Sequence, residues 1–210
     1  MCNACNEGPD APILARMKNT FAGHDQNLTG KLLVAGPVLA GTIFAQSVIY
    51  LCAHSLEDGA MGLIVNRRLS QPGLDDLFAQ LDIEPSPPQR RIGLCMGGPV
   101  DSERGFVLHS TDWEGEGSLG VNGNATLTAS LDVLRELAAG HGPRRAMMAL
   151  GHAAWEPGQL EEEMLRDSAW FVAPATEDIV FGTDHSKKWR QALAAINLDP
   201  GALSMAVGEA

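Results

Sequence analysis

Two histidines stand at the ends of apolar segments, where an imidazole can act as a base. His109 closes "GFVLH" and His54 closes "FAQSVIYLCAH". Imidazole titrates near neutral pH, and a neighbouring carboxylate such as that of Asp112 can orient it for proton transfer. The pattern therefore permits a catalytic role for His109, for example in a hydrolase. A histidine at a strand end is more commonly a structural residue, so both interpretations stay open.

A glycine pair supplies the second chemical feature. "CMGGPVDSERG" places Gly97 and Gly98 shortly before Arg104. Successive glycines can expose backbone N–H groups, either as oxyanion donors or as a nest for an anionic ligand. The stretch lacks the Lys-Ser/Thr of a P-loop and the glycine spacing of a dinucleotide fingerprint. The competing interpretation is a tight turn between two buried strands. The candidate ligand-binding residues are His54, Gly97, Gly98, Arg104 and His109.

The cysteines do not predict a metal centre. Cys2 and Cys5 have C-x-x-C spacing, but no second pair of Cys or His ligands follows at zinc-site spacing. Cys52 and Cys95 lie within apolar segments and are interpreted as small hydrophobic residues. No G-x-S-x-G nucleophile motif occurs. We therefore expect no metal and no cofactor.

Composition narrows the partner classes. The 210 residues are 45% hydrophobic and 20% charged, and the formal net charge is −11. This charge disfavours direct nucleic-acid binding, although four basic clusters leave it as an alternative. The clusters are Arg67–Arg68, Arg90–Arg91, Arg144–Arg145 and Lys187–Lys188–Arg190, which we interpret as solvated surface. The chain shows neither a membrane-length apolar run nor a secretory signal, so a cytoplasmic protein is expected.

The elements that would position these residues are a mixture of strands and helices. Strands are expected over 28–37, 44–54, 60–66, 92–96, 105–109, 144–155, 169–174 and 178–182, from apolar runs between breakers. Helices are expected over 74–83, 130–140, 158–168 and 186–196, from apolar spacing, caps and first-turn acids. The turn Glu57-Asp58-Gly59 predicts a hairpin, 111–124 a long loop or hairpin tip, and 1–27 a disordered tail. Acids Glu161–Glu163 are interpreted as a solvated first turn. This mixture favours an α+β domain.

Several segments in one order resemble the AlgH/YqgE family of bacterial proteins over residues 28–207. They are "LTGKLLVAGP", "FAQSVIYLCAH", "GAMGLIVNR", "GGPV", "RGFVLHS" and "LGHAAWEPGQLEEE". The resemblance implies a single α+β domain over 28–210, with a mixed or antiparallel sheet partly curled into a small barrel and flanked by helices. It also implies a bacterial cytosolic protein. Family members are described as uncharacterised or as proposed transcriptional regulators.

The chain departs from the family pattern at His152, where the family usually has tyrosine within "LGHAAW".

The sequence as a whole leaves three hypotheses for the function. The first is a regulatory protein that acts through a protein partner or a small ligand at the glycine-rich strand ends. The second is an enzyme that uses His109 near Gly97 and Gly98. The third is direct nucleic-acid binding through the arginine pairs. The absence of an assembled catalytic motif favours the first.

Overall fold

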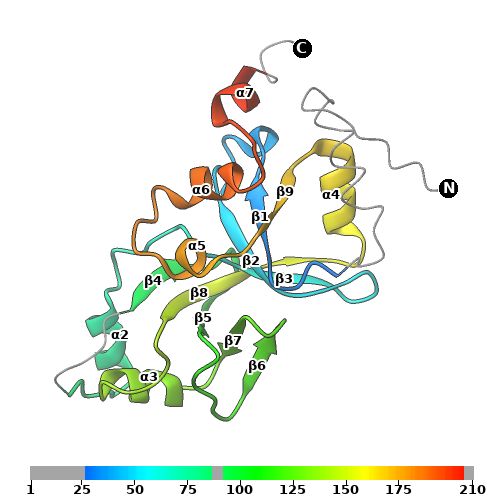
Figure 1. Ribbon diagram of the computed structural model, residues 1–210. Helices are drawn as coiled ribbons and strands as arrows, with labels where there is room; N and C mark the ends of the chain where they lie inside the picture. The colour runs from blue at the N-terminus through cyan, green and yellow to red at the C-terminus, as the bar shows by residue number, and fades with distance from the viewer. Residues whose placement is uncertain (1–26, 87–91, 206–210) are drawn as a thin grey trace.

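Nine strands between Lys31 and Pro174 form one sheet in the computed structural model, which describes residues 27–86 and 92–205 (Figure 1). They are β1 Lys31–Ala35, β2 Val48–Ser55, β3 Gly59–Ile64, β4 Gly93–Met96, β5 Val100–His109, β6 Ser118–Val121, β7 Ala125–Thr128, β8 Ala146–Trp155 and β9 Trp170–Pro174. The sheet order is β6-β7-β5-β8-β3-β2-β1-β9, and β4 pairs with β8 beside this path. The β4–β8 pair is parallel and the other pairs are antiparallel. The prediction of a mixed sheet is confirmed.

The hairpin between β2 and β3 forms where the sequence predicted it. Gly59 has a φ of 86°, a left-handed conformation that glycine adopts without a steric cost. A Cβ atom at this position would lie 2.2 Å from the carbonyl oxygen of Trp155, so the turn also needs glycine for its close packing on β8. The register of β2 on β3 shifts between Leu51 and Ala53, which makes Cys52 the residue at a β-bulge.

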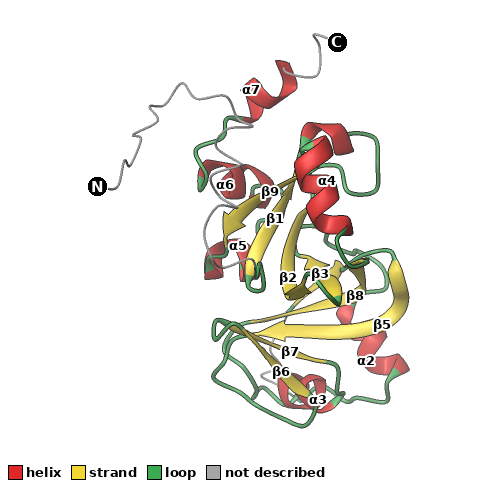
Figure 2. Cartoon of the chain, turned by 90° about the vertical axis from the view of Figure 1, so that its right-hand side faces the viewer, coloured by secondary structure: helices red, strands yellow, loops and turns green. Residues whose placement is uncertain are grey.

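The sheet curls into a half-barrel, and helices cover it at both ends (Figure 2). The helices are α2 Leu74–Gln80, α3 Asp132–Ala138, α4 Gln159–Asp167, α5 Glu177–Phe181, α6 Lys188–Ala194 and α7 Pro200–Met205, with a 3-10 turn at Pro37–Leu39. Helices α2 and α3 lie at the end that holds β4, β5 and β7. Helices α4, α6 and α7 lie at the end that holds β1 and β9 (Figures 1 and 2). The predicted α+β class with a curled sheet is confirmed.

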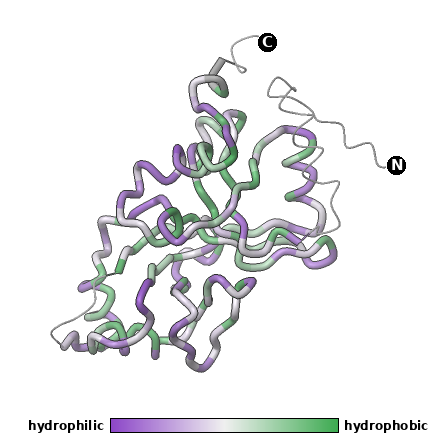
Figure 3. Tube along the Cα trace, in the orientation of Figure 1, coloured by the Kyte–Doolittle hydropathy of each residue, from purple (hydrophilic) through white to green (hydrophobic). Residues whose placement is uncertain are grey.

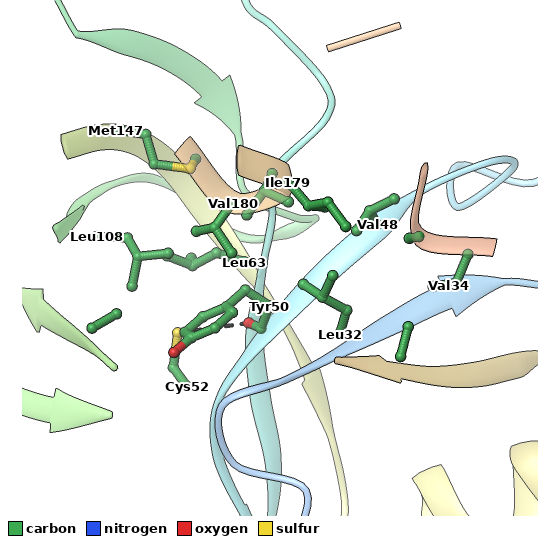
Figure 4. Close-up of a cluster of buried hydrophobic side chains, with 14 of the residues drawn as sticks. Leu32, Val34, Val48, Tyr50, Cys52, Leu63, Leu108, Met147, Ile179 and Val180 are labelled. Carbon is green, nitrogen blue, oxygen red and sulfur yellow. Dashed lines mark hydrogen bonds between the residues drawn. The ribbon is translucent and has the colours of Figure 1, made fainter. Parts of the chain in front are cut away.

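The strands alternate between two cores because successive side chains point to opposite faces. Val48 and Tyr50 belong to the core between the sheet and α5–α7, which Figure 4 shows in close-up, whereas Ile49 and Leu51 pack toward α4. A third core joins α2 and α3 to β4, β5 and β8. In Figure 3, apolar residues are frequent along the central strands and polar residues along many of the outer connections. Each fully buried leucine or isoleucine contributes about 2 kcal/mol of transfer free energy to this packing.

Residues 178–182 were predicted as a strand, and this prediction is wrong because they fall largely within helix α5. Thr176 caps the helix by accepting a hydrogen bond from the backbone N–H of Ile179 at 3.3 Å. Glu177 and Asp178 occupy the first turn, where the helix dipole favours negative charge. These start signals outweigh the short apolar run.

Two elements, β7 and α7, were not predicted from the sequence. The loop predicted over 111–124 contains β6 and leads into the β6–β7 hairpin, and the predicted tail lies outside the described residues except for Asn27.

The Gly97-Gly98 segment links β4 to β5, but these two strands flank β8 and do not pair with each other. The segment crosses β8 at Gly151 and His152. A Cβ atom on Gly98 would lie 2.1 Å from the carbonyl carbon of His152, and one on Gly97 would lie 2.2 Å from the carbonyl oxygen of Gly151. The glycines therefore allow two backbones to touch. The prediction of a tight turn between two buried strands is therefore wrong in part: the Gly97-Gly98 segment connects β4 to β5 by passing across β8, which lies between them.

Candidate functional site

His109 is fully buried at the end of β5, and both of its ring nitrogens are hydrogen-bonded. Nδ1 donates to the carbonyl oxygen of Ser110 at 2.8 Å. In a neutral ring Nε2 is then the acceptor, and it accepts a hydrogen bond from the Thr128 hydroxyl at 2.9 Å. Ser118 in turn donates to Thr128 at 2.9 Å and accepts from the backbone N–H of Gly115 at 3.1 Å. Burial lowers the pKa of His109. The chain of hydrogen bonds holds a neutral imidazole and joins β5, β6 and β7.

The carboxylate predicted to orient His109 has other partners. Asp112 accepts from the hydroxyl of Ser110 and from the backbone N–H of Arg144 at 3.0 Å. The ring of His109 instead packs edge-on against Trp113, with centroids 5.4 Å apart. The described contacts thus leave no ring nitrogen of His109 free for a substrate. A catalytic role for this residue stays a prediction that the geometry does not favour.

His54 is 6% exposed and ties the start of the domain to helix α4. Its Nδ1 accepts from the backbone N–H of Leu28 at 3.0 Å, and its Nε2 donates to the carboxylate of Glu161 at 2.7 Å. The sequence predicted Glu161 to be a solvated acid, and this prediction is wrong because its carboxylate is bonded to His54. Glu163 is not solvated either, because its carboxylate accepts from the indole N–H groups of Trp155 at 3.0 Å and Trp170 at 2.8 Å.

Arg104 lies on the exposed part of β5, away from these two histidines in its contacts. Its guanidinium stands over the ring of Phe106 at 5.2 Å, and the ring of His152 meets Phe106 edge-on at 5.6 Å. Because Gly98 packs on the backbone of His152, Arg104 and the glycine segment do share a neighbourhood. His54 contacts Leu28 and Glu161, and His109 contacts a different set of residues. The predicted candidates thus fall into three separate places.

The sequence missed a buried cluster around the carbonyl oxygen of Val65. Lys188 is 1% exposed, and its Nζ donates to the carbonyl oxygens of Val65 at 2.9 Å and Val180 at 2.8 Å. Burial lowers the pKa of Lys188 to about 8 and raises the pKa of Cys95 to about 11. Nδ1 of His185 lies 3.8 Å from the Cys95 sulfur. The assignment of Lys188 to the solvated surface is therefore wrong, since it lies on the buried face of α6. The high pKa keeps the Cys95 thiol protonated at neutral pH.

A cavity of about 370 Å³ opens between the outer edge of β6 and the β2–β3 hairpin, and we call it the seam cavity. It is lined by Thr29, Cys52, Ala53, His54, Ser55, Asp58, Gly59, Ala60, Met61, Leu119 and Gly120. One end of this seam is bridged, because the amide of Asn122 donates to the carbonyl oxygen of Thr29 at 3.2 Å. Leu119, on the β6 side, is 54% exposed. The seam cavity is therefore the place where a predicted residue, His54, meets an open surface.

Beside Cys52, which lines the seam cavity, the hydroxyl of Tyr50 has unused hydrogen-bonding capacity. Cys52, at the β-bulge, is 3% exposed, and its neighbour Tyr50 is 1% exposed. The Tyr50 hydroxyl has no hydrogen-bond partner among the described residues, and it lies beside the Cys52 side chain in Figure 4. Burial raises the pKa of both groups, that of Cys52 to about 12, so both stay protonated at neutral pH. A buried hydroxyl without a partner is uncommon in a folded protein.

Two other cavities have different linings. One of about 550 Å³ lies between α2 and β4 and is lined by Arg68, Leu69, Ser70, Gly73, Leu74, Asp75, Ile92 and Leu94. One of about 350 Å³ lies beside Trp189 and is lined mainly by apolar residues of the 36–46 loop and α7. Within residues 27–86 and 92–205, no group of three or more His, Cys, Asp or Glu side chains is placed to hold a metal ion. In the same ranges, no helix has the length and apolar character needed to cross a membrane.

The fold and its polar contacts define an α+β half-barrel protein in which the ring nitrogens of His54 and His109 are hydrogen-bonded internally and whose seam is open. A family profile described as DUF179, AlgH-like, matches residues 32–201. The chain therefore belongs to the AlgH-like family, and the predicted family is confirmed.

The relatives are bacterial and similar over nearly their full length. A UPF0301 protein of Gluconobacter oxydans is 79% identical over 183 residues, which cover 87% of this chain and 98% of the relative. A UPF0301 protein of Rhodospirillum rubrum is 44% identical over 194 residues, which cover 92% of this chain and 100% of the relative. The solution structure of the AlgH protein from Pseudomonas aeruginosa matches with a TM-score of 0.70 at 36% identity, over 87% of this chain and 95% of that one.

Proposed function

We propose that the protein is a regulatory binding protein of the bacterial cytoplasm that acts on transcription through a protein partner, which it recognises at the seam cavity. The observation that carries the proposal is the open edge of β6. Leu119 is 54% exposed there, directly above a cavity of about 370 Å³. The cavity can hold an anchoring side chain of a partner, and Leu119 at its rim would be buried in the same contact.

The internal polar contacts support binding over catalysis. The two ring nitrogens of His109 are hydrogen-bonded to Ser110 and Thr128. Those of His54 are hydrogen-bonded to Leu28 and Glu161. A general base needs a nitrogen that can reach the substrate proton. In this proposal both histidines are structural residues that hold the half-barrel in the shape that the partner recognises.

Complementation of a deletion strain tests this proposal. The transcript profile of the strain is compared after expression of the wild-type chain, of Leu119→Asp and of Leu165→Asp. Leu165 is a matched control because it lies on α4 and is 58% exposed. A charge at the seam opposes burial against a partner, so we expect Leu119→Asp to fail where Leu165→Asp restores the profile. Equal levels and equal melting temperatures of the two variants are required. Full restoration by Leu119→Asp would contradict a partner site at the seam.

A further inference from the structure

We propose that the partner presents an extended segment with basic side chains, which pairs as a strand with the outer edge of β6 and places an apolar side chain in the seam cavity. This inference rests on the proposed function and specifies the chemistry of the partner. It is drawn from three features of the seam: a free strand edge, an apolar hollow beneath it and a rim of acidic side chains.

The free edge belongs to β6. This strand pairs with β7 through Ser118–Val121 and ends the sheet order, so its other side has no strand partner within the described residues. A strand edge offers backbone N–H and C=O groups that an extended peptide can bond, whatever the sequence of the peptide. Leu119 and Gly120 of this edge line the seam cavity. A strand added here would run over the hollow.

The opposite edge of the sheet, at β9, is less suitable for the same pairing. Strand β9 ends in Pro174, which has no backbone N–H to donate. Trp170 and Phe171 of β9 are 1% and 5% exposed, so their side chains are committed to the cores. Strand β6 contains no proline, and two of its four residues are exposed. Of these two terminal strands, as far as the described residues show, β6 is the one that is open to a partner in its backbone and its side chains.

The hollow under β6 has the character of an anchor pocket. Cys52, Ala53 and Met61 give it an apolar wall, and the open face lies beside Leu119. Side chains of an added strand alternate in direction, so every second one would point into the cavity and the others toward solvent. An apolar residue alternating with a basic one satisfies both environments.

The basic character follows from the charges that flank the seam. Asp58 lines the cavity, and Glu57 precedes it in the same hairpin turn. Glu114 and Glu116 stand in the connection that leads into β6. All four are exposed, and none forms an ion pair in the part of the chain that the structure describes. The chain as a whole carries −11. Complementary charge on the partner would steer its approach and select against acidic segments.

Two synthetic peptides test the pairing, one of alternating valine and lysine and one of alternating valine and glutamate. Binding is followed by fluorescence anisotropy, and the site is mapped by amide shifts and hydrogen exchange. We expect the valine–lysine peptide to bind at least about tenfold more tightly than the valine–glutamate peptide, and less tightly as salt rises. It should slow exchange and shift the amides of Leu119 and Gly120. Equal binding of both peptides, or shifts confined to other elements, would overturn the proposal.

A third peptide separates strand pairing from charge attraction alone. It keeps the valine–lysine sequence but is N-methylated at alternate residues, in both registers, which removes the donors of a strand ladder and retains every charge. We expect it to lose most of the affinity, and undiminished binding would reject strand addition. A double variant, Glu114→Lys with Glu116→Lys, should weaken the unmodified peptide several-fold while Asp167→Lys, on α4, leaves it unchanged.

Failure of this inference can be told apart from failure of the proposed function. If Leu119→Asp fails to restore the transcript profile and no peptide binds at β6, the seam is a partner site of other chemistry. If Leu119→Asp restores the profile in full, the seam is not a partner site and the proposed function falls with it.

Discussion

Burial of the charged side chain of Lys188 costs this fold free energy. A buried ammonium loses its hydration, and two carbonyl oxygens, those of Val65 and Val180, replace it in part. The pKa of the amine is lowered to about 8 for this reason. Because the unfolded chain binds the proton more tightly than the folded one, the contribution of Lys188 to stability must rise as the pH increases from about 8 to about 10.5.

We predict that Lys188→Met removes this rise. The free energy of unfolding is measured by urea denaturation between pH 7 and pH 10, with both proteins in a Cys95→Ala background, because Lys188 lowers the pKa of Cys95. The parent should gain about 2 to 3 kcal/mol relative to the variant across this range. Cys52 and Tyr50, whose raised pKa values act in the opposite direction, are common to both proteins. Parallel pH profiles would show that Lys188 is not perturbed by burial.

The burial of Lys188 could have been predicted from its position in the helix, although the basic residues around it indicate a solvated surface. Lys188 lies four residues before Ala192, which is fully buried, so helical spacing places the two side chains on the same, inner face of α6. The basic run "KKWR" suggested a solvated surface instead. Its neighbour Lys187 fits that interpretation, because it pairs with Asp184 at the surface. No sequence signal could show that both nitrogens of His109 are used, since Thr128 reaches Nε2 only through the pairing of β5 with β7.

At the scale of the elements, the crossing of the 97–99 segment over β8 sets the relation of β4 to β5. The backbone of Gly98 touches that of His152 so closely that a Cβ atom would lie 2.1 Å from its carbonyl carbon and 2.3 Å from the next backbone nitrogen. Neither atom can move without displacing β8, which pairs with three other strands. The glycine pair is thus a packing requirement of the sheet.

We predict that Gly98→Ala destabilises the protein by about 3 kcal/mol or more, since overpacking against backbone forces a strand to shift. Gly120→Ala is the matched control. It lies in a strand of the same sheet, a Cβ there would meet nothing within 4 Å, and its cost should stay within about 0.5 kcal/mol. Thermal unfolding of both variants measures the difference. Similar melting temperatures of the two variants would contradict a packing requirement for glycine at position 98.

The elements themselves were largely predictable from local pattern. The β2–β3 hairpin follows from the Glu57-Asp58-Gly59 turn, and α4 follows from its first-turn acids. Helix α5 was mistaken for a strand because five apolar or acidic residues carry too little periodicity to decide. The path of the 97–99 segment and the seam cavity depend on long-range pairing, above all of β8 with β3 and β5. Such pairing leaves no trace in the local order of residues, so the candidate site could be found only in part, through His54.

At the scale of the whole molecule, the charge distribution disfavours the hypothesis of direct nucleic-acid binding. The net charge is −11, and several residues of the basic clusters are either paired with acids at the surface or buried. Arg145 pairs with Glu177 at 3.2 Å, Lys187 pairs with Asp184 at 2.6 Å, and Lys188 is buried. A basic surface that could neutralise several phosphates in a row is therefore not provided by these residues.

We predict that the purified protein does not bind a labelled random-sequence DNA duplex, even at about 50 mM salt, where a nonspecific binder would bind far more tightly than at physiological ionic strength. Fluorescence anisotropy at protein concentrations up to about 100 μM covers the range of weak nonspecific affinities. The same preparation should bind the valine–lysine peptide, which shows that it is folded and competent. Binding of the duplex that falls steeply as salt increases would contradict the prediction, because such a slope counts phosphates neutralised by Lys and Arg. It would favour the hypothesis of direct nucleic-acid binding over the proposed protein partner.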